Sequence, residues 1–346
     1  MTQLIPEIPA ASGQMRGVDP WRISVAPMMD CTDRHCRYFL RLLCPHVRLY
    51  SEMVTAAAIM HGDCDRLLRF DPAEHPLALQ LGGSDPRLLA AAVRKAEPYG
   101  YDEINLNVGC PSSRVAEGSF GACLMGSPGL VARCVQAMQA ESGLPVTVKT
   151  RIGIDDRDDY GFLHDFISQV SAAGCRTFVV HARKALLSGL SPKENREIPP
   201  LLYATVYRLK ADFPDLRIIL NGGIDTLAAI RTHLAAGVDG VMIGRKAYAD
   251  PYWLTAVETG VLDRTGMWQP PSRGDVVAAM ARYARQETGE RVRLHHITRH
   301  MLGLYHGQPG ARAWRRFLST RGCAVDAGPE LLLESLKMVT GDDAGF

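Results

Sequence analysis

One cysteine stands where this chain could do chemistry. Residues 104–108 alternate apolar and polar side chains, which predicts a short buried strand, and Cys110-Pro111 follows soon after that strand ends. Pro111 biases Cys110 away from helical backbone. The thiol therefore lies on a stiffened turn beyond a strand end, where α/β enzymes keep their reactive groups. On this stretch alone, a small cysteine that only packs is an equally good interpretation.

Polar side chains and glycines recur at the ends of the other predicted strands. In a parallel α/β barrel the carboxyl ends of all strands meet at one face, where the active site forms. Any one of these residues could be a satisfied polar group inside the barrel, but that interpretation is poor for seven strand ends together. The strand-end residues are Ala26, Pro27, Met28, Met29, Gln80, Cys110, Lys149, Arg151, His181, Arg183, Asn221, Gly222, Gly223, Gly244 and Arg245.

The last two of these strand ends carry glycine, in Asn221-Gly222-Gly223 and in Gly244-Arg245. Glycine lets backbone N–H groups approach an anion closely, and in many barrels the loops after strands seven and eight bind phosphate. Arg245 could add charge-assisted hydrogen bonds. Two ordinary glycine turns are the alternative, but their placement on consecutive final strands favours a phosphate site.

Eight short apolar runs, each followed by a helix-compatible stretch, must position these residues. Strands that alternate with helices form a parallel sheet, and eight units over roughly 230 residues predict an α/β fold, a (β/α)8 TIM barrel, with a doubly wound sheet as the alternative. The predicted strands are 24–29, 47–53, 77–83, 103–109, 145–151, 177–183, 217–223 and 240–245. The predicted helices include 33–43, 86–98, 127–141, 159–173, 201–213 and 226–236, with Asp85, Ser127 and Asp225 as N-caps.

The character of the sequence changes after about residue 260. Residues 268–271 are typical of a linker, and no further strand pattern follows. We therefore expect a flexible leader over 1–20, a catalytic barrel over 21–262 and a small all-helical C-terminal domain over 272–346. The predicted helices of that domain are 274–288, 290–304, 311–318 and 329–339.

The predicted helical domain carries a concentrated positive charge. Between Arg282 and Arg321, nine arginines are opposed only by Glu287 and Glu290, although the whole chain has a net charge of +2. Histidine and aromatic side chains lie between the arginines. This excess favours a surface that binds nucleic-acid phosphates over an ordinary solvated helix face.

Composition excludes several other classes of protein. Nine dispersed cysteines without a CxxC pair predict reduced thiols in a cytoplasmic protein, with no disulfide framework and no metal site. The N-terminus lacks the apolar region of a signal peptide, and no apolar run is long enough for a membrane span. No protein partner is implied, so we expect a monomer.

Several motifs resemble those of the tRNA-dihydrouridine synthases. The segment HARKALLSGLSPKENREIPPL at 181–201 is most similar to the A subfamily, DusA, and the resemblance extends from about Ala26 to Arg316. Cys31 departs from the pattern, because an aromatic residue is expected there. The other matching motifs are APMMDCTDRHCR (26–37), ALQLGG (78–83), EINLNVGCPS (103–112), VTVKTRIGID (146–155), NGGI (221–224) and MIGR (242–245).

The resemblance implies an FMN-containing barrel that uses NADPH to reduce the C5–C6 double bond of uridines in the tRNA D-loop. For the A subfamily these uridines are at tRNA positions 20 and 20a. It implies Cys110 as the proton donor. The implied FMN contacts are Pro27, Met28, Met29, Gln80, Lys149, His181, Asn221, Gly222, Gly223, Gly244 and Arg245. The residues expected to bind tRNA are Asn107, Glu117, Lys193, Arg196, Arg299, Arg312, Arg315 and Arg316.

The residue types agree with this chemistry. Hydride addition to uracil C6 leaves negative charge, and a free thiol, mostly protonated at neutral pH, can supply the proton that C5 needs. Lys149 is expensive to bury unpaired, so an anionic flavin is a fitting partner, with an ion pair to a neighbouring acid as the alternative. The target base must leave its stack to reach the flavin, and the arginine-rich domain could bind the tRNA phosphates while it does so.

Two other functions fit part of the pattern. An FMN barrel that reduces or oxidises a free pyrimidine would explain the strand ends but not the basic C-terminal domain. A tRNA-binding protein that has lost catalysis would explain the basic domain, but the intact set of strand-end residues argues against it.

Overall fold

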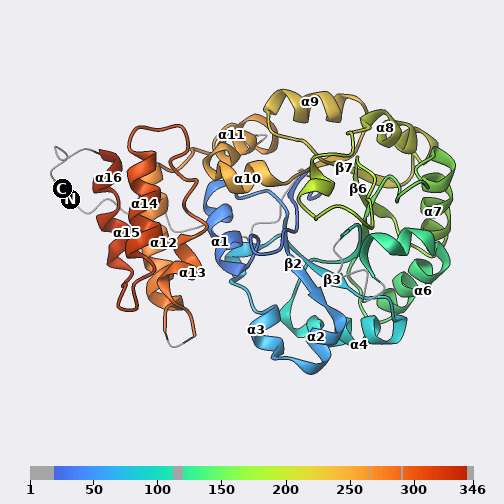
Figure 1. The fold of residues 1–346 in the computed structure, drawn as a ribbon, viewed down its shortest axis with the longest axis horizontal. Coiled ribbons are helices and arrows are strands. Elements are labelled where there is room, and N and C mark those ends of the chain that lie inside the picture. Colours follow the sequence, from blue (N-terminus) through green and yellow to red (C-terminus); the bar gives the residue numbers. More distant parts are fainter. Residues whose placement is uncertain (1–18, 112–119, 264, 290, 341–346) are drawn as a thin grey trace.

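The computed structural model describes residues 19–111, 120–263, 265–289 and 291–340. Across these residues eight parallel strands form one sheet in the order β1-β8-β7-β6-β5-β4-β3-β2 (Figure 1). A doubly wound sheet would reverse its order at a switch point, so that alternative is wrong and the predicted (β/α)8 barrel is confirmed. The strands are β1 (Ile23–Val25), β2 (Leu49–Thr55), β3 (Leu77–Gly82), β4 (Glu103–Val108), β5 (Val146–Arg151), β6 (Thr177–His181), β7 (Arg217–Asn221) and β8 (Gly240–Ile243).

Backbone hydrogen bonds join the two ends of this strand order. Val25 N donates to Arg48 O at 2.9 Å, and Arg48 N donates to Ile23 O at 3.1 Å, directly before β2 begins. The sheet therefore closes on itself. Because the strands are parallel, their carboxyl ends gather at one end of the barrel, which we call the barrel mouth.

The alternation along β4 separates the outside of the barrel from its inside. Ile104, Leu106 and Val108 are buried in the main hydrophobic core between the strands and the outer helices. Asn105 and Asn107 face the barrel interior instead, where Asn105 Nδ2 donates to Thr147 Oγ1 at 2.7 Å. The alternation seen in the sequence thus places polar groups inside the barrel and apolar groups against the helices.

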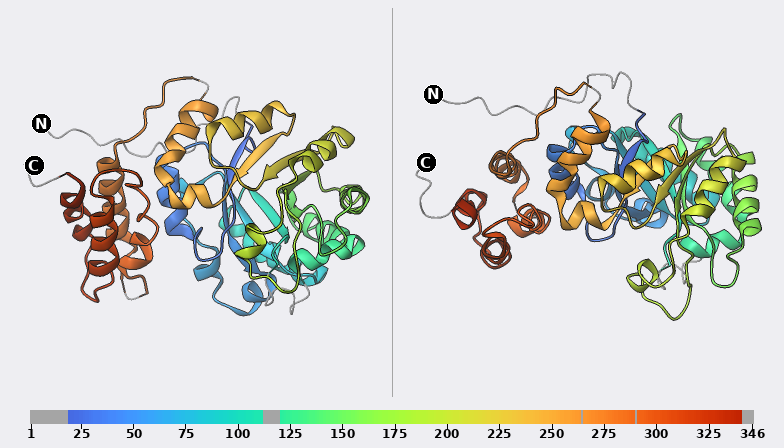
Figure 2. Two further views of the ribbon diagram at one scale, coloured as in Figure 1. Left: turned by 45° about the horizontal axis from the view of Figure 1, so that its top comes forward. Right: turned by 90° about the horizontal axis from the view of Figure 1, so that it is seen from above.

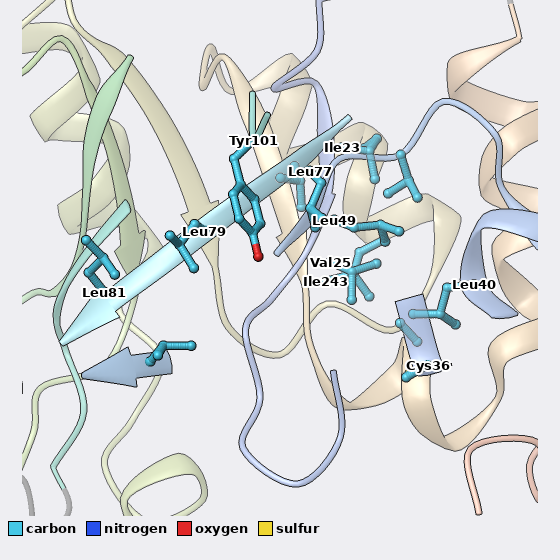
Figure 3. Packing of buried hydrophobic residues seen from close by; sticks show 14 of the residues in the cluster. Ile23, Val25, Cys36, Leu40, Leu49, Leu77, Leu79, Leu81, Tyr101 and Ile243 are labelled. Carbon is cyan, nitrogen blue, oxygen red and sulfur yellow. The ribbon is translucent and has the colours of Figure 1, made fainter. Parts of the chain in front are cut away.

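The outer core is continuous from strand to strand. Figure 3 shows part of it, with Leu77, Leu79 and Leu81 in a row along β3. At the end of the barrel opposite the mouth, Glu103 accepts hydrogen bonds from Trp21 Nε1 at 2.8 Å and from Tyr50 Oη at 2.8 Å. This packed, hydrogen-bonded floor leaves the mouth as the end where side chains can meet a ligand.

The outer helices follow the predicted pattern closely. Six of them match predicted ranges: α1 (Arg34–Leu43), α4 (Pro86–Ala96), α6 (Pro128–Gln139), α7 (Tyr160–Ala172), α8 (Tyr203–Asp212) and α9 (Leu227–Ala235). Shorter helices lie between β2 and β3 and after β8: α2 (Ala56–His61), α3 (Cys64–Leu68), α10 (Arg245–Ala249) and α11 (Leu254–Val257). No helix in the described ranges is long and apolar enough to cross a membrane.

The three predicted N-caps had different outcomes. Asp85 caps α4, accepting hydrogen bonds from Arg87 N and Leu88 N. Ser127 occupies the N-cap position of α6, but its side chain makes no capping hydrogen bond. The prediction of Asp225 as the N-cap of α9 was wrong. The helix begins at Leu227, and its N-cap is Thr226, whose side chain accepts from Ala229 N at 3.1 Å.

After the barrel the chain forms a group of helices beside α1, which we call the helical tail (Figures 1 and 2). It is helical throughout its regular structure, and its core residues join the same buried cluster as the outer layer of the barrel. Its helices are α12 (Arg273–Glu287), α13 (Leu294–Thr298), α14 (Ala311–Arg321), α15 (Glu330–Glu334) and α16 (Lys337–Thr340).

Two predicted tail helices differ from the structure. Within the described residues of the range 290–304, only Leu294–Thr298 is α-helical, and tight turns follow. Gly303 packs closely in this stretch, where a Cβ would lie 2.6 Å from Ala249 O. The range 329–339 is divided between α15 and α16. At this break Ser335 Oγ donates to Leu332 O, which competes with regular helical bonding.

Candidate active site at the barrel mouth

The turn that carries Cys110 is held from two sides. Asn107 Oδ1 accepts from Gly109 N at 3.0 Å and from Cys110 N at 2.9 Å. On the other side, Arg151 Nε donates to Gly109 O at 2.9 Å. Cys110 itself is only partly buried, so its thiol is presented at the mouth on a backbone that hydrogen bonds fix in place.

Asn107 is buried and hydrogen-bonded within the barrel. Only 9% of its surface is exposed, and its Nδ2 donates to Gln80 Oε1 at 2.9 Å. Gln80 Nε2 donates in turn to Asn105 Oδ1 at 2.7 Å. This chain of amides spans β3 and β4, so the orientation of Asn107, and with it the Cys110 turn, depends on the barrel interior.

Lys149 lies beside Asn107 on the neighbouring strand β5. Burial, together with the positive charge of Arg151, lowers the pKa of Lys149 to about 7. Within the described residues its amine has no hydrogen bond and no ion pair, so the neighbouring acid that the sequence allowed as an alternative is not found there. A partly buried amine without an acidic partner suits an anionic ligand.

Arg151 organises the space between the Cys110 turn and the loop after β6. It is only 4% exposed, and its Nη1 donates to Lys184 O and to Asn195 O, each at 3.1 Å. Burial lowers the pKa of Arg151 to about 10, so the guanidinium remains charged at neutral pH. Its position at a strand end was visible in the sequence, but its partners were not, because they are backbone carbonyls of a distant loop.

His181 lies beside Arg151 in the sheet, and Asn221 lies beside His181. Burial lowers the pKa of His181 well below its usual range, and the nearby charges of Arg151 and Lys149 lower it further. The imidazole is therefore neutral at neutral pH. Asn221 Nδ2 donates to Met242 O at 2.8 Å, which fixes the amide between β7 and β8.

The glycines after β7 are required by their surroundings. Gly222 and Gly223 have φ angles of +118° and +69°, which side chains rarely adopt. A Cβ at Gly222 would lie 2.8 Å from the His181 ring, and one at Gly223 would lie 2.5 Å from Leu201. Tyr203, which sequence reasoning missed, donates its hydroxyl to Gly222 O at 2.8 Å and holds this turn.

Gly244 differs from those two glycines, because a Cβ there would meet no atom within 4 Å among the described residues. The backbone at the start of α10 is thus open to approach. Arg245, the first residue of that helix, is exposed and pairs with Glu197 at 2.8 Å. A phosphate site near the ends of β7 and β8 stays a prediction.

The β1 end forms a tight turn at the mouth. Pro27 and Met28 are partly buried, whereas Met29 is 54% exposed. Thr32 holds the turn, because its hydroxyl accepts from Met28 N at 2.9 Å. Asp30 has a φ of +61°, an uncommon backbone conformation for a residue other than glycine.

Apart from Asn107 on β4, the described residues predicted to bind tRNA lie in the loop after β6 and in the helical tail. Lys193 and Arg196 are exposed around a short 3-10 helix, η4 (Glu194–Arg196), in the loop after β6. Arg312, Arg315 and Arg316 are exposed on α14, and within the described residues none of them has an acidic partner. Glu117 lies outside the described residues.

Arg299 and Arg315 share a groove between α10 and the helical tail. The groove has a volume of about 650 Å³. Arg299 also pairs with Asp33 on the barrel at 2.7 Å, so it is partly committed to joining the tail to the barrel. The structure thus separates a buried set of charges at the mouth from an exposed set on α14.

Comparisons with known proteins agree with this geometry. The chain matches the family model Dihydrouridine synthase (Dus) over residues 24–337. It is 56% identical to the tRNA-dihydrouridine(20/20a) synthase of Synechocystis sp. over 315 residues, covering 91% of this chain and 93% of that protein. It is 57% identical to the tRNA-dihydrouridine(20/20a) synthase of Escherichia coli K12 over 319 residues, 92% and 91% of the two chains. It is 58% identical to that of Pseudomonas aeruginosa over 299 residues, 86% and 89% of the two chains. The chain therefore belongs to the dihydrouridine synthase family, as its sequence motifs predicted.

Proposed function

We propose that this protein is a tRNA-dihydrouridine synthase that reduces the C5–C6 double bond of D-loop uridines at positions 20 and 20a. The observation that carries the proposal is the fixed Cys110 turn next to Lys149, an amine without an acidic partner among the described residues. A positioned thiol and a site for an anionic cofactor are the two parts that the reaction needs. The relatives named above carry this activity in their names.

The mouth fits FMN, with NADPH as the reductant. Lys149 would face the anionic part of the flavin, and the open backbone at Gly244 with Arg245 would take its phosphate. Gln80, His181, Asn221 and the Pro27–Met29 turn would line the remaining surface. When bound, FMN supplies the hydride that uracil C6 receives.

Cys110 supplies the proton. Its Sγ–H bond breaks as the new C–H bond forms at uracil C5, which leaves a thiolate. Lys149 and Arg151 lie close enough to Cys110 for the thiolate charge to raise the pKa of both. The hydrogen bond that Cys110 N donates to Asn107 and the one that Arg151 donates to Gly109 O keep the sulfur aimed at the base.

The helical tail binds the RNA around the target base. A uridine in the D-loop must leave its stack to reach the mouth, so part of the binding energy must come from contacts elsewhere on the tRNA. We assign the phosphate contacts to Arg312, Arg315 and Arg316, and we assign the choice of uridine to Lys193 and Arg196. Residues 21–262 then form the FMN-binding barrel, and residues 272–346 form the tRNA-binding domain.

The proposal also places the protein in the cytoplasm as a monomer. Its nine cysteines are all free, as expected in a reducing compartment. A single copy supplies both the charges at the mouth and the exposed arginines of the tail, so the reaction needs no second subunit.

Mass spectrometry of tRNA tests the proposal directly. In a strain that lacks the gene, tRNA should lose dihydrouridine at positions 20 and 20a, and a plasmid copy should restore it. Unchanged dihydrouridine at both positions, in a strain shown to lack the protein, would contradict the proposed function.

A further inference from the structure

His300 connects the helical tail to two separate segments of the barrel. It is fully buried, and its Nε2 lies 3.0 Å from the carboxylate of Asp33, which precedes α1. Its Nδ1 lies 3.2 Å from the hydroxyl of Tyr248 on α10. One imidazole of the tail therefore contacts both the segment that follows β1 and the segment that follows β8.

Asp33 is the centre of this junction. Its Oδ1 caps α1 by accepting from Cys36 N at 3.0 Å, and its Oδ2 accepts from Arg299 Nη2 at 2.7 Å. Burial raises the pKa of Asp33, but the hydrogen bonds from His300 and from Cys36 N, together with nearby positive charge, lower it more, and the pKa ends well below its usual range. A buried carboxylate with these partners stays ionised and fixed in direction.

On the barrel side, the junction lies next to the mouth. Thr32, directly before Asp33, holds the Met28 turn at the β1 end. Tyr248 lies on the short helix α10, which begins at Arg245 after the β8 end. Both barrel contacts of His300 thus belong to segments that shape the proposed cofactor site.

On the tail side, the junction leads to α14. Met301 follows His300 in the chain, and its carbonyl accepts from Trp314 Nε1 at 3.2 Å. Trp314 is fully buried on α14, between the exposed residues Arg312, Arg315 and Arg316. Direct contacts therefore run from the mouth, through Asp33 and His300, to the helix with the free arginines.

We propose that Asp33 and His300 are positioning residues, which set the direction of α14 relative to the barrel mouth so that a tRNA bound by the tail presents its uridine to Cys110. The inference rests on the proposed function. A substrate held at a slightly wrong angle still binds, but it reacts slowly, because a misplacement of about 1 Å can cost about a hundredfold in rate. The junction should therefore affect the rate at saturating tRNA more than it affects affinity.

The same interface offers a matched control. Glu287, in the last turn of α12, pairs with Arg34 at 2.9 Å and with Arg69 at 3.3 Å. These pairs also join the tail to the barrel, but Glu287 bonds to neither Asp33 nor Tyr248, the two barrel residues that His300 contacts. A variant of Glu287 therefore reports the effect of weakened docking alone.

The test compares Asp33→Asn, His300→Gln and the double variant with Glu287→Gln. Asn keeps the helix cap of α1 but removes the charge that Arg299 and His300 require.

We expect oxidation of the pre-reduced enzyme by saturating tRNA to slow by about tenfold to a hundredfold in both single variants. The Kd for tRNA should change by less than about threefold, and reduction by NADPH should be unchanged. The double variant should equal either single variant, because the two residues act as one unit. Glu287→Gln should react at the parent rate.

Several results would overturn the inference. The first is a parent rate at saturating tRNA in both single variants, and the second is an additive loss of rate in the double variant. The third is a loss of tRNA affinity without a loss of rate, and the fourth is an equal loss of rate in Glu287→Gln. If Asp33→Asn does not fold, His300→Gln decides the question, with NADPH oxidation as the measure of intact protein.

A second measurement is independent of the reaction. Hydrogen exchange of the protein without RNA should be faster in peptides within residues 294–304 for Asp33→Asn, but not for Glu287→Gln. Unchanged exchange in those peptides would show that the contact between Asp33 and His300 does not stabilise this part of the tail. If exchange changes as expected while the parent protein makes no dihydrouridine, the proposed function fails and the structural junction stands.

Discussion

The barrel mouth and the helical tail both carry an excess of positive side chains, but they hold them differently. At the mouth, Arg151 is buried and donates to three backbone carbonyls. On the tail, Arg312, Arg315 and Arg316 are exposed, without an acidic partner among the described residues. A charge fixed by the protein suits one small ligand in one geometry, whereas a free charge suits an RNA backbone that is met in solution.

This difference separates two tasks that the same residue type can perform. Fixed cations at the mouth should control the rate of the chemical step and the affinity for the cofactor, and both quantities should depend only weakly on salt. Free cations on the tail should control RNA affinity, with strong dependence on salt. The variants below test whether the two regions divide the work in this way.

The largest effect is expected at the mouth, for Cys110→Ala. Oxidation of pre-reduced enzyme by unmodified tRNA should slow by about 10² to 10⁴, the usual contribution of a positioned acid. FMN content and reduction by NADPH should be unchanged, because neither needs a proton at C5. Cys110→Ser should restore little of the rate, since a hydroxyl gives up its proton less readily than a thiol. Stopped-flow absorbance under anaerobic conditions gives the rate.

Cys123 provides the internal control for Cys110. It is a second, partly buried cysteine near the mouth, and its Sγ donates to the backbone carbonyl of Phe120 at 3.1 Å. Cys123→Ala should react at the parent rate. A parent rate and normal dihydrouridine yield in Cys110→Ala would show that the thiol is not the acid.

The next effect concerns cofactor affinity and its dependence on pH. Since the pKa of Lys149 is about 7 in the free protein, the amine loses its charge as the pH rises above 7. An anionic ligand binds the charged form, so FMN affinity should fall between about pH 7 and pH 9, by up to tenfold per pH unit. Lys149→Met should bind FMN weakly and with little pH dependence over that range. Fluorescence titration measures both, and an equally steep pH dependence in the variant would rule out Lys149 as the partner.

Lys149 also affects the stability of the ligand-free protein. Its folded pKa of about 7 lies below the unfolded value of about 10.4, so the unfolded chain binds more protons between these two pH values. The free energy of unfolding should therefore rise with pH across this window. Lys149→Met should lack this contribution, as denaturant titrations at several pH values would show.

On the tail, replacing Arg312, Arg315 and Arg316 together with alanine should weaken tRNA binding. Each lost phosphate contact should reduce the slope of log K against log salt by roughly 0.7 to 0.9. Reduction by NADPH should be unaffected, because the three side chains lie on α14 and none belongs to a strand end of the barrel. Intact tRNA affinity combined with a loss of NADPH oxidation would reverse the roles given to the two regions.

The smallest effect is expected for Lys193 and Arg196. Both are exposed in the loop after β6, whose backbone carbonyl at Asn195 is held by Arg151. Replacing both with alanine should lower D-loop modification severalfold while leaving FMN content unchanged. Mass spectrometry of the tRNA measures the first quantity, and flavin absorbance measures the second. Modification at the parent level would argue against a role in choosing the uridine.

The sequence predicted the barrel well because its signals are local. Alternation from Ile104 to Val108, and similar apolar runs elsewhere, locate each strand from a few neighbouring residues. The gathering of the strand-end residues at the mouth could then be predicted, because the carboxyl ends of parallel strands in a barrel lie at the same end. Local signals were weaker in the tail, where the predicted helix 290–304 is α-helical only over Leu294–Thr298 among the described residues.

What the sequence could not reveal are contacts between distant residues. Asp33 and His300 are 267 positions apart, and neither has a sequence pattern that predicts the pair. Asn107 was predicted to face tRNA, and that role stays a prediction, but its bond to Cys110 N and its bond to Gln80 became visible only in three dimensions. Such partners depend on the packing of whole elements, which no local pattern records.

One measurement tests most directly whether both regions serve a single reaction on tRNA. Pre-reduced enzyme is mixed without oxygen with either unmodified tRNA or free uridine, and flavin oxidation and dihydrouridine are followed together. The proposed function predicts fast oxidation by tRNA, with one dihydrouridine formed for each flavin oxidised, and little reaction with uridine at the same concentration. Equal rates with free uridine, or oxidation by tRNA without dihydrouridine, would contradict it.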